Sequence, residues 1–194
     1  MLAAILKGGW MMVPLALCSL ISLSIIIERF FFFRRLRNAD PAPKVLELVR
    51  GGRLGDGLKL AQNSPLPLLK VLSAGMNNPD APSKAMEAAG ITEYAVLRRG
   101  LPALDTIVTL SPLLGLLGTI IGMINSFQIM ALSGMGQPHA VTGGVAEALI
   151  ATATGIGVAV ITLVPYNYFS SRVERESEII EQYATQLEMA LGER

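Results

Sequence analysis

Three long apolar segments restrict the environment in which this chain can fold. They lie at 8–33, 104–132 and 141–169, and each exceeds the roughly 20 apolar residues that a helix needs to cross about 30 Å of hydrocarbon. Lipid offers backbone groups no hydrogen-bonding partner, so such segments cross as helices. With 52% hydrophobic and only 16% charged residues, the chain is also too apolar for an ordinary soluble domain. We therefore predict an all-α membrane protein with three transmembrane helices.

The first apolar segment has an alternative interpretation as a cleaved signal peptide, because Lys7 precedes it. Its apolar run is longer than a usual signal core, and no small-x-small cleavage site follows. The basic cluster RRLR at 34–37 is typical of a stop-transfer flank. We therefore expect this segment to remain as a helix, with Cys18, the only cysteine, as a buried thiol that forms no internal disulfide.

The distribution of Lys and Arg predicts the orientation of the spans. Segment 34–103 carries 11 basic and 6 acidic residues and the tail 170–194 begins SSRVERE, whereas the loop 133–140 has no basic residue. Basic loops are retained on the cytoplasmic side of a membrane. We expect segment 34–103 and the tail in the cytoplasm, and the amino terminus and the loop on the opposite side.

The cytoplasmic parts are predicted to be helical. Pro and Gly divide most of segment 34–103 into three short pieces with apolar residues at helical spacing, PAPKVLELVRGG, RLGDGLKLAQNS and PLPLLKVLSAGMNNPD. We expect a longer helix from about Ser83 to run into the second span, with a bend at Pro102. The tail is expected to prolong the third span as a helix into water. These long extensions and the small helical insert complete the predicted fold.

Small residues recur in the second and third spans at positions that favour close helix packing. The second span contains Gly115, Gly118 and Gly122, and the third contains Gly155 among several alanines. In lipid, small residues let two helix backbones approach, which is a main route to association. We predict that these four glycines pack membrane helices of this chain or of further copies.

One carboxylate, Glu147, stands in the apolar run GGVAEALIATATGIG, and the third span has no Lys or Arg. An ionised group near the bilayer centre costs at least about 2.5 to 3.5 kcal/mol, so such residues face protein or water and mark ion pathways. The alternative is a carboxyl group near the membrane edge that local hydroxyl or backbone groups satisfy. We expect Glu147 at a seam between helices.

Thr152 lies about 140° around the same helix from Glu147, on a narrow stripe with Ala148 and Gly155. We expect this stripe to face a lumen or a central partner. The alternative for Thr152, and for Thr119 and Thr154, is a hydroxyl that bonds to a carbonyl one turn back and has no further role. The residues alone leave both interpretations open.

The sequence argues against several classes of function. It has no Gly-rich phosphate loop with its Lys, no nucleophile with a base, and a single His. The lone cysteine and the lack of a His/Cys cluster argue against a metal site. A net charge of +1 does not indicate a nucleic-acid-binding face. We expect no enzyme activity, no metal and no cofactor.

Two motifs carry a resemblance to a known family. SPLLGLLGTIIGMINSF at 111–127 and AEALIATATGIGVAVITLVPYNYF at 146–169 resemble the signature of the ExbB/TolQ/MotA proton-channel family. The resemblance extends to the ERF sequence at 28–30 and to the helical insert around 94–101, so it covers nearly the whole chain. Three spans and a small insert are most similar to an ExbB- or TolQ-type subunit, because MotA has a fourth span and a larger cytoplasmic region.

The resemblance implies a motor in the inner membrane of a bacterium, and the proton motive force drives this motor. Family members form pentamers around a single-span partner of the ExbD/TolR type, whose aspartate exchanges the proton, and they pass work to a TonB-like envelope protein. By position, Thr119 and Thr152 match the pore-lining threonines, and Glu147 matches the third-helix glutamate, which the family associates with structure or proton handling at helix contacts. The alternatives are a TolQ-like subunit of the Tol-Pal system or a non-conducting membrane scaffold.

Overall fold

The computed structural model describes residues 9–36, 41–133 and 138–192, and it describes side chains for all of these except 132–133 and 138–141. Every regular element in these ranges is a helix. Three of the helical stretches, Met12–Leu36, Leu101–Ala131 and Thr142–Gly192, are long and apolar enough to cross a membrane. The predicted class, an all-α membrane protein with three spans, is confirmed. The chain divides into two compact units, unit 1 (Met1–Glu28 and Gly100–Asn167) and unit 2 (Arg29–Arg99 and Tyr168–Arg194).

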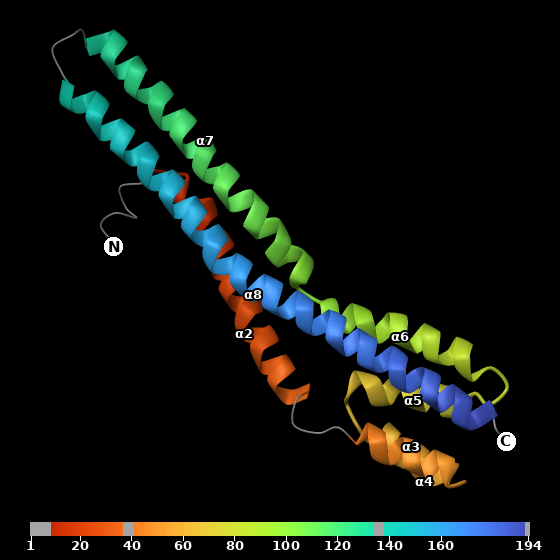
Figure 1. The fold of residues 1–194 in the computed structure, drawn as a ribbon. Coiled ribbons are helices and arrows are strands. Elements are labelled where there is room, and N and C mark those ends of the chain that lie inside the picture. Colours follow the sequence, from red (N-terminus) through yellow and green to blue (C-terminus); the bar gives the residue numbers. More distant parts are fainter. Residues whose placement is uncertain (1–8, 37–40, 134–137, 193–194) are drawn as a thin grey trace. The chain divides into compact units, whose positions relative to one another are not determined.

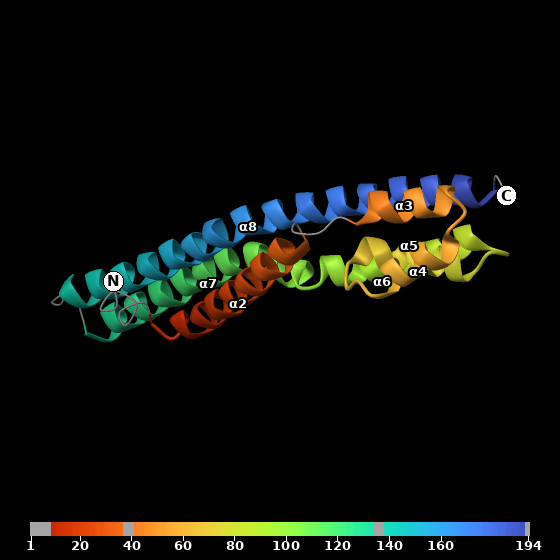
Figure 2. The same ribbon diagram turned by 90° about the horizontal axis from the view of Figure 1, so that it is seen from below.

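Unit 1 contains the apolar stretches of three helices. They are the first part of α2 (Met12–Leu36), all of α7 (Leu101–Ser133) and the first part of α8 (Pro138–Gly192). The membrane stretches of α7 and α8 lie side by side in both ribbon views (Figure 1, Figure 2). Of the loop predicted at 133–140, residues 134–137 lie outside the described residues, and 138–140 already belong to α8.

The expected uninterrupted helix from about Ser83 into the second span is wrong. Helix α6 (Pro82–Arg98) ends at Arg98. A turn follows, and α7 begins at Leu101. The turn is made by Gly100, whose φ of +79° is strained for any residue with a side chain. A Cβ atom on Gly100 would also lie 2.9 Å from Cγ2 of Ile25. Pro102 then falls in the first turn of α7, where its missing N–H is not needed.

Unit 2 contains three short helices where three short pieces were predicted, namely α3 (Ala42–Arg50), α4 (Leu54–Gln62) and α5 (Pro67–Asn77). Helices α3, α5 and α6 each have a proline in the first turn. Proline has no N–H group, and N–H groups in a first turn have no acceptor within their own helix, so proline is well tolerated there. Helix α3 ends where Gly52 takes a φ of +80° and Arg53 N–H donates to the Leu48 carbonyl at 2.9 Å. Local sequence signals therefore determine where these helices begin and end.

The helices of unit 2 pack in pairs along the chain, α3 with α4, α4 with α5, and α5 with α6. Gly75 of α5 lets Met86 of α6 approach, because a Cβ atom there would lie 2.6 Å from the Met86 Cγ. Lys70 Nζ pairs with the buried Glu93 carboxylate at 3.0 Å and joins the same two helices. The tail is helical as expected, and its buried apolar side chains lie seven, seven and three residues apart along α8, at Val173, Ile180, Leu187 and Ala190.

Candidate functional site

Four glycines bring the backbones of α7 and α8 into direct contact in unit 1. A Cβ atom on Gly115 would lie 2.9 Å from Thr152 Cα, and one on Gly118 would lie 2.8 Å from Ala151 Cβ. A Cβ atom on Gly122 would lie 2.9 Å from that of Ala148, and one on Gly155 would meet the Ser111 carbonyl oxygen. The four predicted packing positions therefore all lie at one helix–helix interface, where only hydrogen fits.

Thr152 joins this interface through a hydrogen bond between the two helices. Its Oγ1 donates to the Gly115 carbonyl at 2.9 Å. The stripe that the sequence assigned to a lumen face, with Ala148 and Gly155, faces α7 of the same chain, because its small residues permit the closest backbone approach. Thr152 itself remains partly exposed. Its assignment to a pore stays a prediction that depends on the assembly.

The other two threonines bond within their own helices. Thr119 Oγ1 donates to the Leu116 carbonyl at 2.6 Å, and Thr154 Oγ1 donates to the Ile150 carbonyl at 2.8 Å. This is the local pattern that threonine adopts in a membrane helix. Both side chains are partly exposed, so each hydroxyl can also accept a hydrogen bond from outside the chain. The pore role of Thr119 likewise stays a prediction.

Glu147 lies on the surface of unit 1 rather than among its buried residues. Its carboxylate is next to Gly9, just before α2, and a Cβ atom on Gly9 would collide with it. Gly9 also has a φ of +69°, which favours glycine. No residue in the described ranges forms an ion pair or hydrogen bond with the Glu147 side chain, so further protein or water must solvate it. The predicted helix–helix seam would need a neighbouring chain.

The chemistry of this interface is that of hydroxyl and carbonyl groups in an apolar wall. Within residues 9–36, 41–133 and 138–192, no three His, Cys, Asp or Glu side chains are placed to hold a metal ion. The hydroxyl groups of Thr119 and Thr152 can donate and accept hydrogen bonds along α7 and α8, and the Glu147 carboxylate can accept them. Such groups can contact protons or polar partners.

Arg29 is a residue whose importance sequence reasoning missed. Only 2% of it is exposed. Its Nη1 donates to the carbonyls of Val96 at 3.1 Å and Leu97 at 3.4 Å, at the carboxyl end of α6, and its Cζ lies 4.7 Å from the centre of the Phe32 ring. Helix-terminal carbonyls lack partners in their own helix. The sequence signal was the ERF sequence at 28–30, which was interpreted only as part of the family resemblance.

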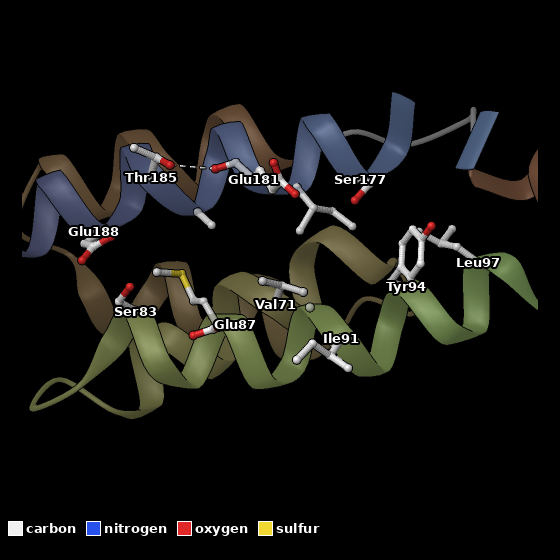
Figure 3. Close-up of a pocket in the computed structure, with 14 residues that line it drawn as sticks. Val71, Ser83, Glu87, Ile91, Tyr94, Leu97, Ser177, Glu181, Thr185 and Glu188 are labelled. Carbon is white, nitrogen blue, oxygen red and sulfur yellow. Dashed lines mark hydrogen bonds between the residues drawn. The ribbon is translucent and has the colours of Figure 1, made fainter. Parts of the chain in front are cut away.

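A groove of about 730 Å³ opens in unit 2 between α6 and the last part of α8 (Figure 3). Apolar side chains line it, including Ile91, which is 68% exposed, and Tyr94. Its other lining residues include Glu87, Glu181 and Glu188, and no Lys or Arg among the described residues lines it. Exposed apolar surface with a polar rim marks an interaction site.

Comparison with known proteins gives a consistent result over most of the chain. Residues 63–182 match the MotA/TolQ/ExbB proton channel family. The biopolymer transport protein ExbB-like 3 of Synechocystis sp. is 37% identical over 192 residues, which cover 95% of this chain and 91% of that protein. The Tol-Pal system protein TolQ of Pseudomonas aeruginosa is 41% identical over 92 residues, 47% of this chain and 40% of TolQ. The biopolymer transport protein ExbB of Salmonella typhimurium is 41% identical over 75 residues, 39% of this chain and 31% of ExbB.

Proposed function

The chain belongs to the MotA/TolQ/ExbB proton channel family, and on that premise we propose that it is a channel and motor subunit of an inner membrane. In this proposal the proton motive force drives protons past α7 and α8, and the complex transmits the resulting work to an envelope process. The loops richest in Lys and Arg, 34–103 and the start of the tail, face the cytoplasm, and the amino terminus faces the periplasm.

The observation that carries the proposal is that the α7–α8 pair leaves polar side chains of its membrane stretches exposed. The two helices are joined by glycine-to-backbone contacts, yet Glu147, Asn125 and Gln128 point away from the core of unit 1. Polar groups in a membrane face other protein or water, because hydrocarbon cannot solvate them. Further helices that complete the wall would provide such a protein surface. This supports an assembly of several copies, for which the family resemblance suggests a pentamer.

The partner in this proposal is a single-span protein of the ExbD/TolR type, held within the ring of α7 and α8 helices. Its aspartate would carry the proton, while Thr119 and Thr152 would line the path and Glu147 would lie where neighbouring helices meet. No cofactor is needed, because the proton is the transported ion. The exposed apolar groove of unit 2 supports contact with a further chain on the cytoplasmic side.

We propose the ExbB-type branch, with a TonB-like protein as the recipient of the work. The basis is the ExbB-like relative that matches 95% of this chain, since TolQ of Pseudomonas aeruginosa and ExbB of Salmonella typhimurium match only 47% and 39% of it. A TolQ-like role in a Tol-Pal system is the alternative branch. A TonB-like protein or a Tol-Pal protein in a neighbouring reading frame would distinguish the two branches.

The test of the proposed function is co-purification of the full chain with the candidate single-span partner from the neighbouring reading frame. We expect a stable complex in detergent whose mass, from native mass spectrometry, corresponds to several copies of this chain and fewer of the partner. Replacement of the partner's span aspartate by asparagine is the matched control and should leave this mass unchanged. A chain that purifies as a monomer, with no partner retained, would contradict the proposal.

A further inference from the structure

A second cavity lies in unit 2 where the end of α2 meets α8. Its volume is about 280 Å³, and six residues line it: Phe30, Phe33, Arg34, Tyr168, Phe169 and Arg172. The rings of Phe33 and Phe169 stack with centroids 5.6 Å apart and planes 13° from parallel, and they hold the two helices together. Among the residues that the structure describes, two guanidinium groups and no carboxylate line this cavity, so its described lining favours negative charge.

One arginine that lines the cavity, Arg172, has a hydrogen-bond donor without a partner. The Nε of Arg172 is buried, and no described residue accepts a hydrogen bond from it. A buried donor on a cation is costly to leave unpaired, and native structures satisfy nearly all such groups. An anionic oxygen bound by the Arg172 guanidinium group would offset the charge of this incompletely paired cation. Arg34 is exposed across the cavity and adds a second planar fork of donors.

The position along the chain indicates the source of such an anion. Phe30 and Phe33 end the apolar part of the first span, and Tyr168 and Phe169 end that of the third. Aromatic residues mark the level of the headgroups in membrane proteins, with Lys and Arg just beyond on the cytoplasmic side. Basic pockets between membrane helices at this level bind anionic headgroups. The cavity thus combines an aromatic wall, two arginines and the depth at which lipid phosphates lie.

We propose that this cavity binds a phosphoryl group, presented by the headgroup of an anionic phospholipid. Arg34 and Arg172 bind its oxygens through charge-assisted hydrogen bonds, which are shorter and stronger than neutral ones. The aromatic side chains cover the adjoining glycerol. Only the assignment to the cytoplasmic leaflet rests on the proposed orientation, whereas the site rests on the cavity itself. Bound lipid would tie the end of α2 to α8.

The test uses the purified full chain in a non-ionic detergent, with dioctanoyl phosphatidylglycerol as the probe and binding followed by the shift in melting temperature. We expect saturable binding to the wild type. Arg34→Gln and Arg172→Gln should each weaken it by about tenfold or more, because each removes a charged hydrogen bond. Arg35→Gln is the matched control, because Arg35 lies beside Arg34 in the exposed last turn of α2 but does not line the cavity.

Two further probes separate the source of the phosphate from the binding of acyl chains. Dioctanoylglycerol has the same chains without phosphate, and equal binding of this lipid would overturn the proposal. Inorganic phosphate that binds with the same dependence on Arg34, while the lipid does not, would support the phosphoryl site and assign it to a soluble ligand. Lipid binding that is unchanged in Arg34→Gln, an exposed position whose replacement leaves the fold intact, would also overturn the proposal.

Discussion

A Gly155→Val variant is expected to lose the packing of α7 against α8. A Cβ atom at this position would meet the Ser111 carbonyl oxygen and lie 3.1 Å from Gly115 Cα, and both are backbone atoms of α7 that cannot rotate away. Overpacking of a tight interface lowers the free energy of unfolding by about 1 to 3 kcal/mol. A side chain that clashes with backbone atoms is expected to cost at least the upper value of this range. We expect a melting temperature lowered by many degrees, or degradation in the cell, in a fluorescence-detected size-exclusion assay.

The matched control for Gly155→Val is Gly157→Val, two residues further along α8. A Cβ atom on Gly157 would have no atom of the described chain within 4 Å. The two variants share the change in helix propensity, so their difference isolates the contact with α7. Similar melting temperatures for the two variants would show that the α7–α8 interface does not depend on Gly155.

Replacement of the Arg29 guanidinium group is the second change expected to have a large effect on stability. In Arg29→Gln the carbonyls of Val96 and Leu97 lose a charged donor, and the Phe32 ring loses its cation. Hydrogen bonds to charged groups contribute about 1.5 to 3 kcal/mol each, and their loss leaves buried acceptors unpaired. We expect the free energy of unfolding to fall by about 3 kcal/mol, measured by thermal denaturation in detergent.

Two further variants give the Arg29 prediction its specificity. Arg29→Lys keeps the charge but not the planar fork, so an intermediate loss is expected. Arg98→Gln removes an exposed arginine from the last turn of α6 and should change stability by less than about 1 kcal/mol. If Arg29→Gln melts at the temperature of Arg98→Gln, the buried contacts of Arg29 do not stabilise unit 2.

The sequence predicted the elements of this fold well because their signals are local. Apolar length marks the three spans, and Pro and Gly mark the ends of α3, α4 and α5. The break at Gly100 was missed because helical periodicity continues on both sides of it. What separates α6 from α7 is a single positive φ, at a glycine that also adjoins Ile25, and that residue is distant in the sequence.

The sequence predicted which residues belong to the candidate site, but not which neighbouring helix each of them contacts. Helical angles separate Thr152 from Glu147, yet they do not say which neighbour each face meets. The structure turns the Thr152 stripe toward α7 of the same chain, where Gly115 accepts its hydrogen bond. Arg29 was missed because a buried arginine and a flanking arginine look alike in a sequence, and only the carbonyls at the end of α6 reveal the difference.

The most direct test of the account measures proton uptake into vesicles that contain this chain and its single-span partner, driven by an imposed membrane potential. The test variant is Thr119→Val with Thr152→Val. Thr119 bonds only within its own helix, and the Thr152 bond to Gly115 contributes about 1 kcal/mol in a membrane. Thr154→Val is the matched control, because Thr154 also bonds within its own helix and has no predicted role in the pore.

We predict that the wild-type and Thr154→Val complexes conduct protons, and that the double variant assembles to the same mass but conducts at least about tenfold less, since about 1.4 kcal/mol on a barrier is a factor of ten. The scaffold alternative predicts no difference among the three. Proton uptake by the double variant at the wild-type rate, with the complex intact, would contradict the claim that these threonines line the proton path.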